Sequence, residues 1–158
     1  MCESSITGKP NRITILETKK CLDWYLGLLL PDLNTLVHVD VVFRPYLKRT
    51  YGTEAQVRST DHCESPRDFT LVLDNCMSRI KTLKSIAHEC VHIKQLAINE
   101  LSCGSEDGDN IWWFGKAVDP DLDYWFTPHE IEAMGMEVGL YKKYMEMIRR
   151  EKINLKRV

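Results

Sequence analysis

The feature that most constrains the fold is a helical pattern over residues 78–100 that carries two histidines. Apolar residues recur in it at three- and four-residue steps, the spacing of one helical face: Ile80, Leu83, Ala87 and Val91. His88 and His92 are four residues apart, so they lie on one face of the helix, one turn above the other. The spacing therefore predicts a helix that presents two imidazoles together.

The segment from His88 to His92 reads His-Glu-Cys-Val-His, the pattern H-E-x-x-H. Two imidazole nitrogens on one helical face can converge on a zinc ion at about 2.0–2.1 Å. Glu89 lies one residue beyond His88, so it does not point at the metal but can reach its water and act as general base. Random placement of 5 His and 12 Glu would give about 0.01 such motifs in this chain.

A catalytic zinc takes three protein ligands, and a second helix offers the third. Thr127 is a suitable N-cap, with Pro128 at the first helical position and Glu130 three residues after the cap, as in a capping box. This helix should run to about residue 151. Packed across the first helix, its first turn would lie over the histidines, and we expect Glu130 to complete the site. Its face would carry one stripe, in which the small Ala133 allows close approach: Glu130, Ala133, Met134, Glu137 and Tyr141.

Other groups could supply the third ligand. His129 is a rival, because three histidines also make a zinc site, whereas Glu132 points elsewhere on the same helix. Glu100 is excluded, because on a continuous helix it would lie about 12 Å beyond His92. Five aspartates stay possible, although aspartate in turns usually caps the backbone: Asp107, Asp109, Asp119, Asp121 and Asp123. The cluster Asp61-His62-Cys63-Glu64 matches no zinc spacing.

Several other side chains lie near the expected site in sequence. Tyr124 and His129 flank the start of the second helix, where either could stabilise the oxyanion of peptide hydrolysis. The aromatic run 112–114 is expected to close the core beneath the loop 104–110, with the wall of a substrate cleft as the alternative. Cys90 lies about 200° around the helix from His88, so it should face the core.

The rest of the sequence predicts short strands and one more helix. We expect strands at 12–16, 37–43, 55–60 and 69–73, a helix at 17–30 that stops before Pro31, and a hairpin at 111–118. Strands gather in the first half and long helices in the second, so the predicted class is α+β. A length of 158 residues fits one domain, residues 1–158.

Composition and charge exclude several classes of protein. Hydrophobic content of 44% and charged content of 28% argue against disorder, collagen and coiled-coil rods. A net charge of -2 gives no basic face for nucleic acid. The longest apolar stretch, residues 24–30, is too short for a membrane span of about 20 residues. With no export signal at the N-terminus, we expect a cytoplasmic protein.

The six cysteines form no C-x-x-C pair. A core of this size does not need disulfides for stability. We therefore expect free thiols, mostly buried as small hydrophobic residues.

Four segments together resemble a known family: Ala87–Gln95 (AHECVHIKQ), Trp113–Gly115 (WFG), Pro128–Ala133 (PHEIEA) and Glu137–Tyr141 (EVGLY). They are similar to small zinc metallopeptidases of the zincin group that are often encoded by bacteriophages. The resemblance covers about residues 70–145. The pairing of H-E-x-x-H with a later Glu three residues before an Ala is also similar to the gluzincins.

The resemblance implies a zincin-like fold, in which a small twisted β-sheet packs on the H-E-x-x-H helix and a second long helix follows at the C-terminus. It implies Glu130 as third zinc ligand and, for a phage protein, the host cytoplasm. Gluzincins carry an acidic residue four positions after this ligand, where this chain has Met134. We therefore expect the group that orients a ligating histidine to be Asp74, Asp123 or a backbone carbonyl.

The sequence thus predicts a zinc metallopeptidase that cleaves a peptide or protein substrate, with Glu89 as general base and His88, His92 and Glu130 as ligands. Two other functions fit the same motif. One is a non-catalytic zinc domain that binds a partner protein, in which His129 would close the site as a fourth ligand. The other is a metallohydrolase, such as an amidase, that acts on a non-protein substrate. The sequence does not specify an oligomeric state.

Overall fold

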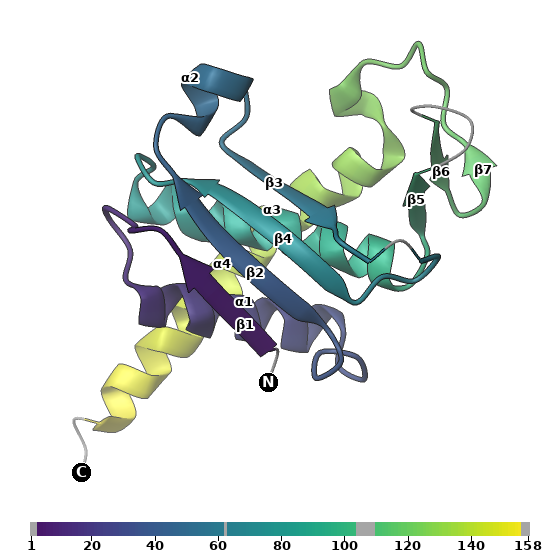
Figure 1. Ribbon diagram of the computed structural model, residues 1–158. Coiled ribbons are helices and arrows are strands. Elements are labelled where there is room, and N and C mark those ends of the chain that lie inside the picture. The colour runs from purple at the N-terminus through teal and green to yellow at the C-terminus, as the bar shows by residue number, and fades with distance from the viewer. Residues whose placement is uncertain (1–2, 62, 104–109, 156–158) are drawn as a thin grey trace.

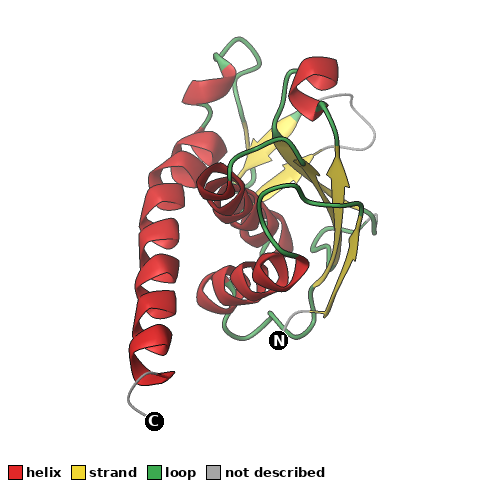
Figure 2. Cartoon of the chain, turned by 90° about the vertical axis from the view of Figure 1, so that its left-hand side faces the viewer, coloured by secondary structure: helices red, strands yellow, loops and turns green. Residues whose placement is uncertain are grey.

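The computed structural model describes residues 3–61, 63–103 and 110–155. Its larger sheet has four strands in the order β1-β2-β4-β3: β1 (Glu3–Thr7), β2 (His38–Arg44), β3 (Ala55–Ser59) and β4 (Asp68–Asp74). The three long helices lie on one side of this sheet (Figures 1 and 2): α1 (Ile15–Leu29), α3 (Arg79–Ala97) and α4 (Pro128–Leu155). This arrangement confirms the predicted α+β class.

Short elements connect and extend these layers. A short helix α2 (Leu47–Tyr51) lies between β2 and β3, and a 3₁₀ turn η1 (Tyr124–Phe126) precedes α4. A second sheet has three strands: β5 (Leu101–Cys103), β6 (Ile111–Trp113) and β7 (Lys116–Ala117). Strands β6 and β7 pair in antiparallel fashion, which confirms the hairpin predicted at 111–118.

The larger sheet is mixed. Strands β1, β2 and β4 are parallel, and β3 runs antiparallel to β4 at the edge of the sheet. The register pairs buried apolar residues of β2 and β4: Val39 with Phe69, Val41 with Leu71, and Phe43 with Leu73. Each of the three strands predicted in this region is present, with ends shifted by at most one residue.

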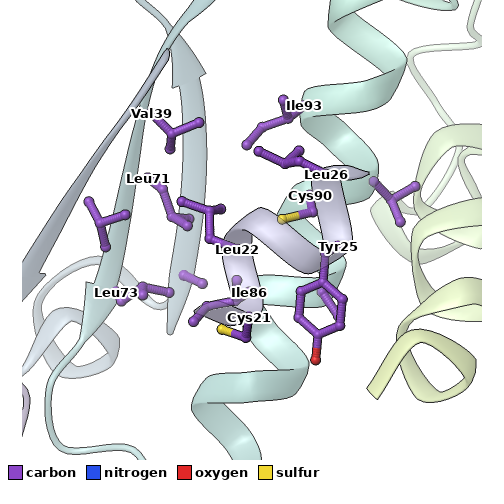
Figure 3. Close-up of a cluster of buried hydrophobic side chains, with 14 of the residues drawn as sticks. Cys21, Leu22, Tyr25, Leu26, Val39, Leu71, Leu73, Ile86, Cys90 and Ile93 are labelled. Carbon is purple, nitrogen blue, oxygen red and sulfur yellow. The ribbon is translucent and has the colours of Figure 1, made fainter. Parts of the chain in front are cut away.

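Helix α3 lies at the centre, in contact with the sheet, α1 and α4. Its Ile86, Cys90 and Ile93 are buried in the core together with Leu22 of α1 and Leu71 of β4 (Figure 3). Cys90 therefore faces away from the histidine side, as predicted. Burial of each large apolar side chain contributes about 1.5–3 kcal/mol. This packing fixes the helix, and with it the position of the histidines.

The N-terminal segment corrects the prediction. Residues 12–16 do not form a strand, because α1 begins at Ile15 and Thr14 caps it by accepting a hydrogen bond from the backbone N–H of Glu17 at 3.0 Å. The N-terminal strand is instead β1, whose largely polar sequence Glu-Ser-Ser-Ile-Thr shows no clear alternation. The helix predicted at 17–30 is confirmed with an earlier start.

Helix α4 begins at Pro128, as predicted, and continues to Leu155, beyond the predicted end. Its buried residues stop at Tyr144, and the remainder is rich in charged side chains: the buried set is His129, Glu130, Ala133, Leu140 and Tyr144. Of the helices in the described ranges, none combines the length and apolar character needed to cross a membrane.

The four thiols that the structure describes form no disulfide, as predicted, but fewer are buried than predicted. Cys21 and Cys90 are buried, whereas Cys63 and Cys76 are exposed. Cys63 lies in the polar loop before β4 and Cys76 in the turn after it. Cys2 and the side chain of Cys103 lie outside the described residues.

Candidate metal centre

Three side chains meet where the first turn of α4 packs against α3. His88 Nε2 lies 3.1 Å from His92 Nε2 and 3.3 Å from Glu130 Oε2, and His92 Nε2 lies 3.2 Å from Glu130 Oε1. Across the described ranges, this trio is the group of metal-ligating side chains whose donor atoms converge. The structure therefore brings together the three residues predicted as ligands.

The spacing of these groups leaves room for one shared metal ion. A tetrahedral zinc with bonds of about 2.0–2.1 Å puts its ligand atoms about 3.3 Å apart, and the two imidazole nitrogens are 3.1 Å apart. Each of them contacts a different oxygen of Glu130, and one ligand atom from each of the three residues lies within 4.8 Å of the other two. Glu130 is only 2% exposed, and its Oε2, which lies 3.3 Å from His88 Nε2, makes no well-aligned hydrogen bond in the described part of the chain. A buried acceptor without a donor is costly, and a bound cation would satisfy it.

The close approach of the two helices depends on a small residue. Ala133 lies one turn after Glu130 and is fully buried. Farther along the same face, Glu137 Oε2 lies 3.7 Å from His88 Nδ1 and its Oε1 lies 4.0 Å from Lys84 Nζ. Of the stripe predicted on this helix, Glu130, Ala133 and Glu137 therefore face α3, whereas Met134 is 37% exposed.

The charges of the site are strongly coupled. Burial alone would raise the pKa of Glu130, but the facing rings of His88 and His92 and the hydroxyl of Tyr124 lower it well below its usual value. Burial alone would lower the pKa of His92, but its hydrogen bond to Glu130 and the charge of Glu89 raise it. The lowered pKa of Glu130 and the raised pKa of His92 both favour an ionised Glu130 carboxylate beside a positive charge.

Glu89, the predicted general base, lies beside this centre. It is 6% exposed and takes a backbone hydrogen bond from Val57 of the edge strand β3. Burial raises the pKa of Glu89, although the nearby histidines partly oppose the shift. A carboxylate with a raised pKa is suited to exchange protons near neutral pH.

Two cavities meet at the candidate site. One of about 340 Å³ has apolar walls from β3, the end of α3 and the second sheet, including Val57, Leu96 and Ile111. The other, of about 610 Å³, has walls that include Tyr51 and Met134. Glu89, Tyr124 and Glu130 line both cavities. The candidate site therefore borders two cavities.

The two predicted oxyanion donors take different positions. The Tyr124 hydroxyl donates a hydrogen bond to Glu130 Oε1, and burial together with this bond raises the pKa of Tyr124. His129 is buried, and its ring centroid lies 6.0 Å from that of His92, outside the group of converging ligand atoms. Its Nδ1 has no hydrogen-bond partner among the described residues. Tyr124 is thus in direct contact with the third ligand, whereas His129 lines the smaller cavity.

Several predicted alternatives are not at the centre. Glu132 was predicted to point elsewhere on α4, but it faces α3. Its carboxylate accepts hydrogen bonds from Lys94 Nζ at 2.9 Å and from Gln95 Nε2 at 2.7 Å. Glu100 also pairs with Lys94. Asp119 accepts from Asp121 N at 2.9 Å, and Asp123 accepts from Trp125 N at 3.0 Å. These aspartates cap turns, while Asp107 and Asp109 lie outside the described residues.

The groups that contact the outer nitrogens of the histidines were not predicted. Asp74 accepts hydrogen bonds from Lys48 N and Cys76 N, so neither it nor the turn-capping Asp123 orients a ligand. His92 Nδ1 instead lies 2.8 Å from Gln95 Oε1. In the sequence, the signal for this contact is weak: Gln95 lies three residues beyond His92 on the same helix.

The predicted capping box at the start of α4 is wrong. The backbone N–H of Thr127 donates to Tyr124 O at 3.2 Å, and its hydroxyl donates to the same carbonyl at 2.7 Å. The Glu130 carboxylate faces the histidines instead of returning to Thr127. Glu130, which the sequence suggested as part of a capping box, is instead part of the candidate metal centre.

The aromatic run 112–114 also departs from the prediction. Trp112 and Phe114 are 39% and 61% exposed, so they do not close the core. Phe114 and Gly115 both have positive φ at the tip of the β6–β7 hairpin, a geometry that turns the chain sharply. The ring of Trp113 lies 6.4 Å from that of His129, next to the smaller cavity.

The loop before β4 uses its polar groups locally. Asp61 accepts hydrogen bonds from Arg67 N at 2.7 Å and Asp68 N at 3.2 Å, while Cys63 contacts the same carboxylate. His62 lies outside the described residues. The described part of this loop therefore forms a turn stabilised by Asp61.

Comparison of the chain with protein-family models, with curated proteins and with solved structures gives no significant match. The function proposed below therefore depends on the residues of the site and their geometry.

Proposed function

We propose that this protein is a zinc-dependent metallopeptidase with a zincin-like site, in which His88, His92 and Glu130 hold the metal and Glu89 is the general base. The observation that carries the proposal is the convergence of two imidazoles and one carboxylate, with contacts of 3.1–3.3 Å between their nitrogen and oxygen atoms, beside the second buried carboxylate, that of Glu89. A structural ion site would not require Glu89 at that position. A hydrolytic site requires it.

The donor set favours zinc. Two imidazole nitrogens and one carboxylate oxygen are a donor set typical of catalytic zinc. When bound, zinc polarises the scissile carbonyl and lowers the pKa of water toward about 7. Metal affinity alone does not select zinc over copper or nickel, so the assignment depends on geometry and ligand type.

Glu89 would carry the proton through the reaction. In its ionised form it accepts a proton from the attacking water, and its raised pKa then allows it to hold that proton. It next donates the proton to the amine nitrogen as the peptide bond breaks. Tyr124, whose hydroxyl lies at the ligand Glu130, is the nearest candidate to donate to the developing oxyanion.

The number of converging ligands favours catalysis over a purely structural ion. Three side chains converge in the described part of the chain, and His129 is not one of them. A closed structural site takes four protein ligands, whereas a catalytic site keeps one position open. The arrangement therefore supports a hydrolase better than it supports a closed zinc domain.

The edge strand β3 offers a binding mode for the substrate. It is paired with β4 on one side, and its residues 55–57 line the smaller cavity beside Glu89. An extended peptide could add to this edge through backbone hydrogen bonds. Such a mode favours peptides over compact non-protein substrates, and the apolar wall formed by Val57, Leu96 and Ile111 favours an apolar side chain near the scissile bond.

The substitution Glu89→Gln tests the proposal. It keeps the size of the side chain but removes the base, so peptide cleavage should fall by about 100-fold or more while zinc content stays at the wild-type value. Cleavage is measured on a mixed peptide library, and zinc by elemental analysis of the same preparations. Unchanged cleavage by the variant would contradict the assigned base, and cleavage of cell-wall fragments alone would replace the peptidase with an amidase.

A further inference from the structure

The carboxamide of Gln95 lies fully buried against His92, at the ring nitrogen that does not face Glu130. Its Oε1 is 2.8 Å from His92 Nδ1. Its Nε2 is 3.0 Å from the carbonyl oxygen of His129 and 2.7 Å from Glu132 Oε2. Both ends of the amide therefore have partners, on α3 itself and on α4.

These partners determine which way the amide faces. A carbonyl oxygen and a carboxylate oxygen only accept hydrogen bonds, so the amide group that faces His129 O and Glu132 must be the NH₂, with its two hydrogens. The amide oxygen then faces His92, and since it only accepts, His92 Nδ1 must carry the hydrogen. Turning the amide over would set its oxygen against two acceptors.

We propose that Gln95 is a positioning residue that holds neutral His92 in the tautomer with hydrogen on Nδ1 and a free lone pair on Nε2. Neutral imidazole has one donor and one acceptor nitrogen, and a metal ligand must be the acceptor. His92 Nε2 is the nitrogen that lies 3.1 Å from His88 Nε2 and 3.2 Å from Glu130 Oε1. Gln95 therefore directs the lone pair to the candidate metal position.

A second set of contacts holds the amide itself. Glu132 accepts from Lys94 Nζ at 2.9 Å, and Lys94 also pairs with Glu100. The lysine side chain is 14% exposed, so this cluster is largely removed from solvent. Glu132, which is not a ligand, thus acts on His92 through Gln95. Mutation of the group that hydrogen-bonds a metal-ligating histidine typically lowers metal affinity by about 10–100-fold.

The role of Gln95 in metal binding rests on the proposed function, but the tautomer does not, so the first test uses metal-free protein. The histidine rings are labelled with ¹⁵N, and long-range ¹H–¹⁵N spectra are recorded at alkaline pH, where the rings are neutral. In the neutral ring of wild-type His92, Gln95 Oε1 at 2.8 Å from Nδ1 competes for the hydrogen with Glu130 Oε1 at 3.2 Å from Nε2, and the shorter contact should keep the hydrogen on Nδ1. Gln95→Leu, which has similar size but no amide, should move most of it to Nε2, with His38 as an internal control.

A further variant separates positioning from packing. Glu132→Gln, which leaves the core of α3 untouched, lets the Gln95 amide turn over and should give a mixture. The proposal is overturned if wild-type His92 carries its hydrogen on Nε2, or if Gln95→Leu and Glu132→Gln both keep the wild-type tautomer.

Zinc affinity provides the second readout, measured by competition with a chelating dye. Gln95→Leu should bind zinc about 10–100-fold more weakly than wild type, and Glu132→Gln should show a smaller loss. Wild-type affinity in Gln95→Leu would overturn the proposed role in metal binding. If the wild-type protein binds no zinc but has the expected tautomer, the metallopeptidase proposal fails while the positioning of His92 by Gln95 holds.

Discussion

Two buried carboxylates, Asp74 at the end of β4 and Glu130 at the start of α4, stay ionised for different reasons. Burial opposes ionisation of both, yet the pKa of each is lowered. Asp74 accepts from backbone N–H groups, those of Lys48 at 3.0 Å and Cys76 at 2.8 Å. Glu130 instead faces side chains that can themselves change protonation or bind a metal.

The difference separates a structural carboxylate from a functional one. Backbone N–H groups cannot lose their protons or move away without unfolding the turn, so Asp74 stabilises the junction of β4 with α2. The histidines that face Glu130 can exchange a proton for a metal ion, and one oxygen of Glu130 makes no well-aligned hydrogen bond among the described residues. Burial and a lowered pKa are therefore not enough to identify a site; the identity of the partners decides.

The largest expected effect comes from Glu130→Gln. Loss of the carboxylate should weaken zinc binding by more than about 100-fold, because removing a ligand exceeds the about 10–100-fold cost of removing a group behind one. The fold should remain, since the variant also removes a buried charge. Zinc affinity is measured by dye competition and the fold by circular dichroism. Tight zinc binding by the variant would shift the third ligand to His129.

An intermediate effect is expected from Asp74→Asn, the matched substitution at the structural carboxylate. One oxygen becomes an NH₂ that faces a backbone N–H, so the free energy of unfolding should fall by about 1–3 kcal/mol. Zinc affinity should stay at the wild-type value. Urea denaturation and the same dye assay check both quantities. If Asp74→Asn weakened zinc binding as much as Glu130→Gln does, the two carboxylates would not differ as described.

The smallest expected effect is the pH dependence of the difference in stability between wild type and Asp74→Asn. Because the pKa of Asp74 is lower in the folded protein, its contribution to stability is present above the unfolded value of about 3.9 and is lost as the pH falls through the folded value. The gap in stability between wild type and Asp74→Asn should therefore narrow in acid. Urea denaturation over a series of pH values measures the gap, and a gap that widens as the pH falls would contradict this account.

The sequence predicted the parts of the site that depend on regular spacing. His88 and His92 follow from their four-residue separation on an apolar-faced helix, and Glu130 from its place in the first turn of the next one. Contacts that depend on how the helices pack were missed, above all Gln95. An amide three residues beyond a histidine is common on helices, and only the carbonyl of His129 and the carboxylate of Glu132 give it a defined orientation.

The fold shows the same limit. Strands β2 and β4 were predicted because their buried face alternates with a more polar one. At the N-terminus the pattern misled, since Ile13 and Ile15 suggest a strand while the Thr14 cap starts a helix. The edge strand β1 gave little signal, because its residues are half-buried or exposed and mostly polar. Edges and caps depend on the neighbours that three-dimensional packing supplies.

The most direct test of the metal centre is X-ray absorption at the zinc edge on purified wild-type protein, together with its zinc content. The account predicts about one zinc per chain, bound by two imidazoles and further oxygen ligands at about 2.0–2.2 Å, and loss of this signal in Glu130→Gln. Protein that takes up no zinc, or zinc bound by sulfur at about 2.3 Å, would contradict it.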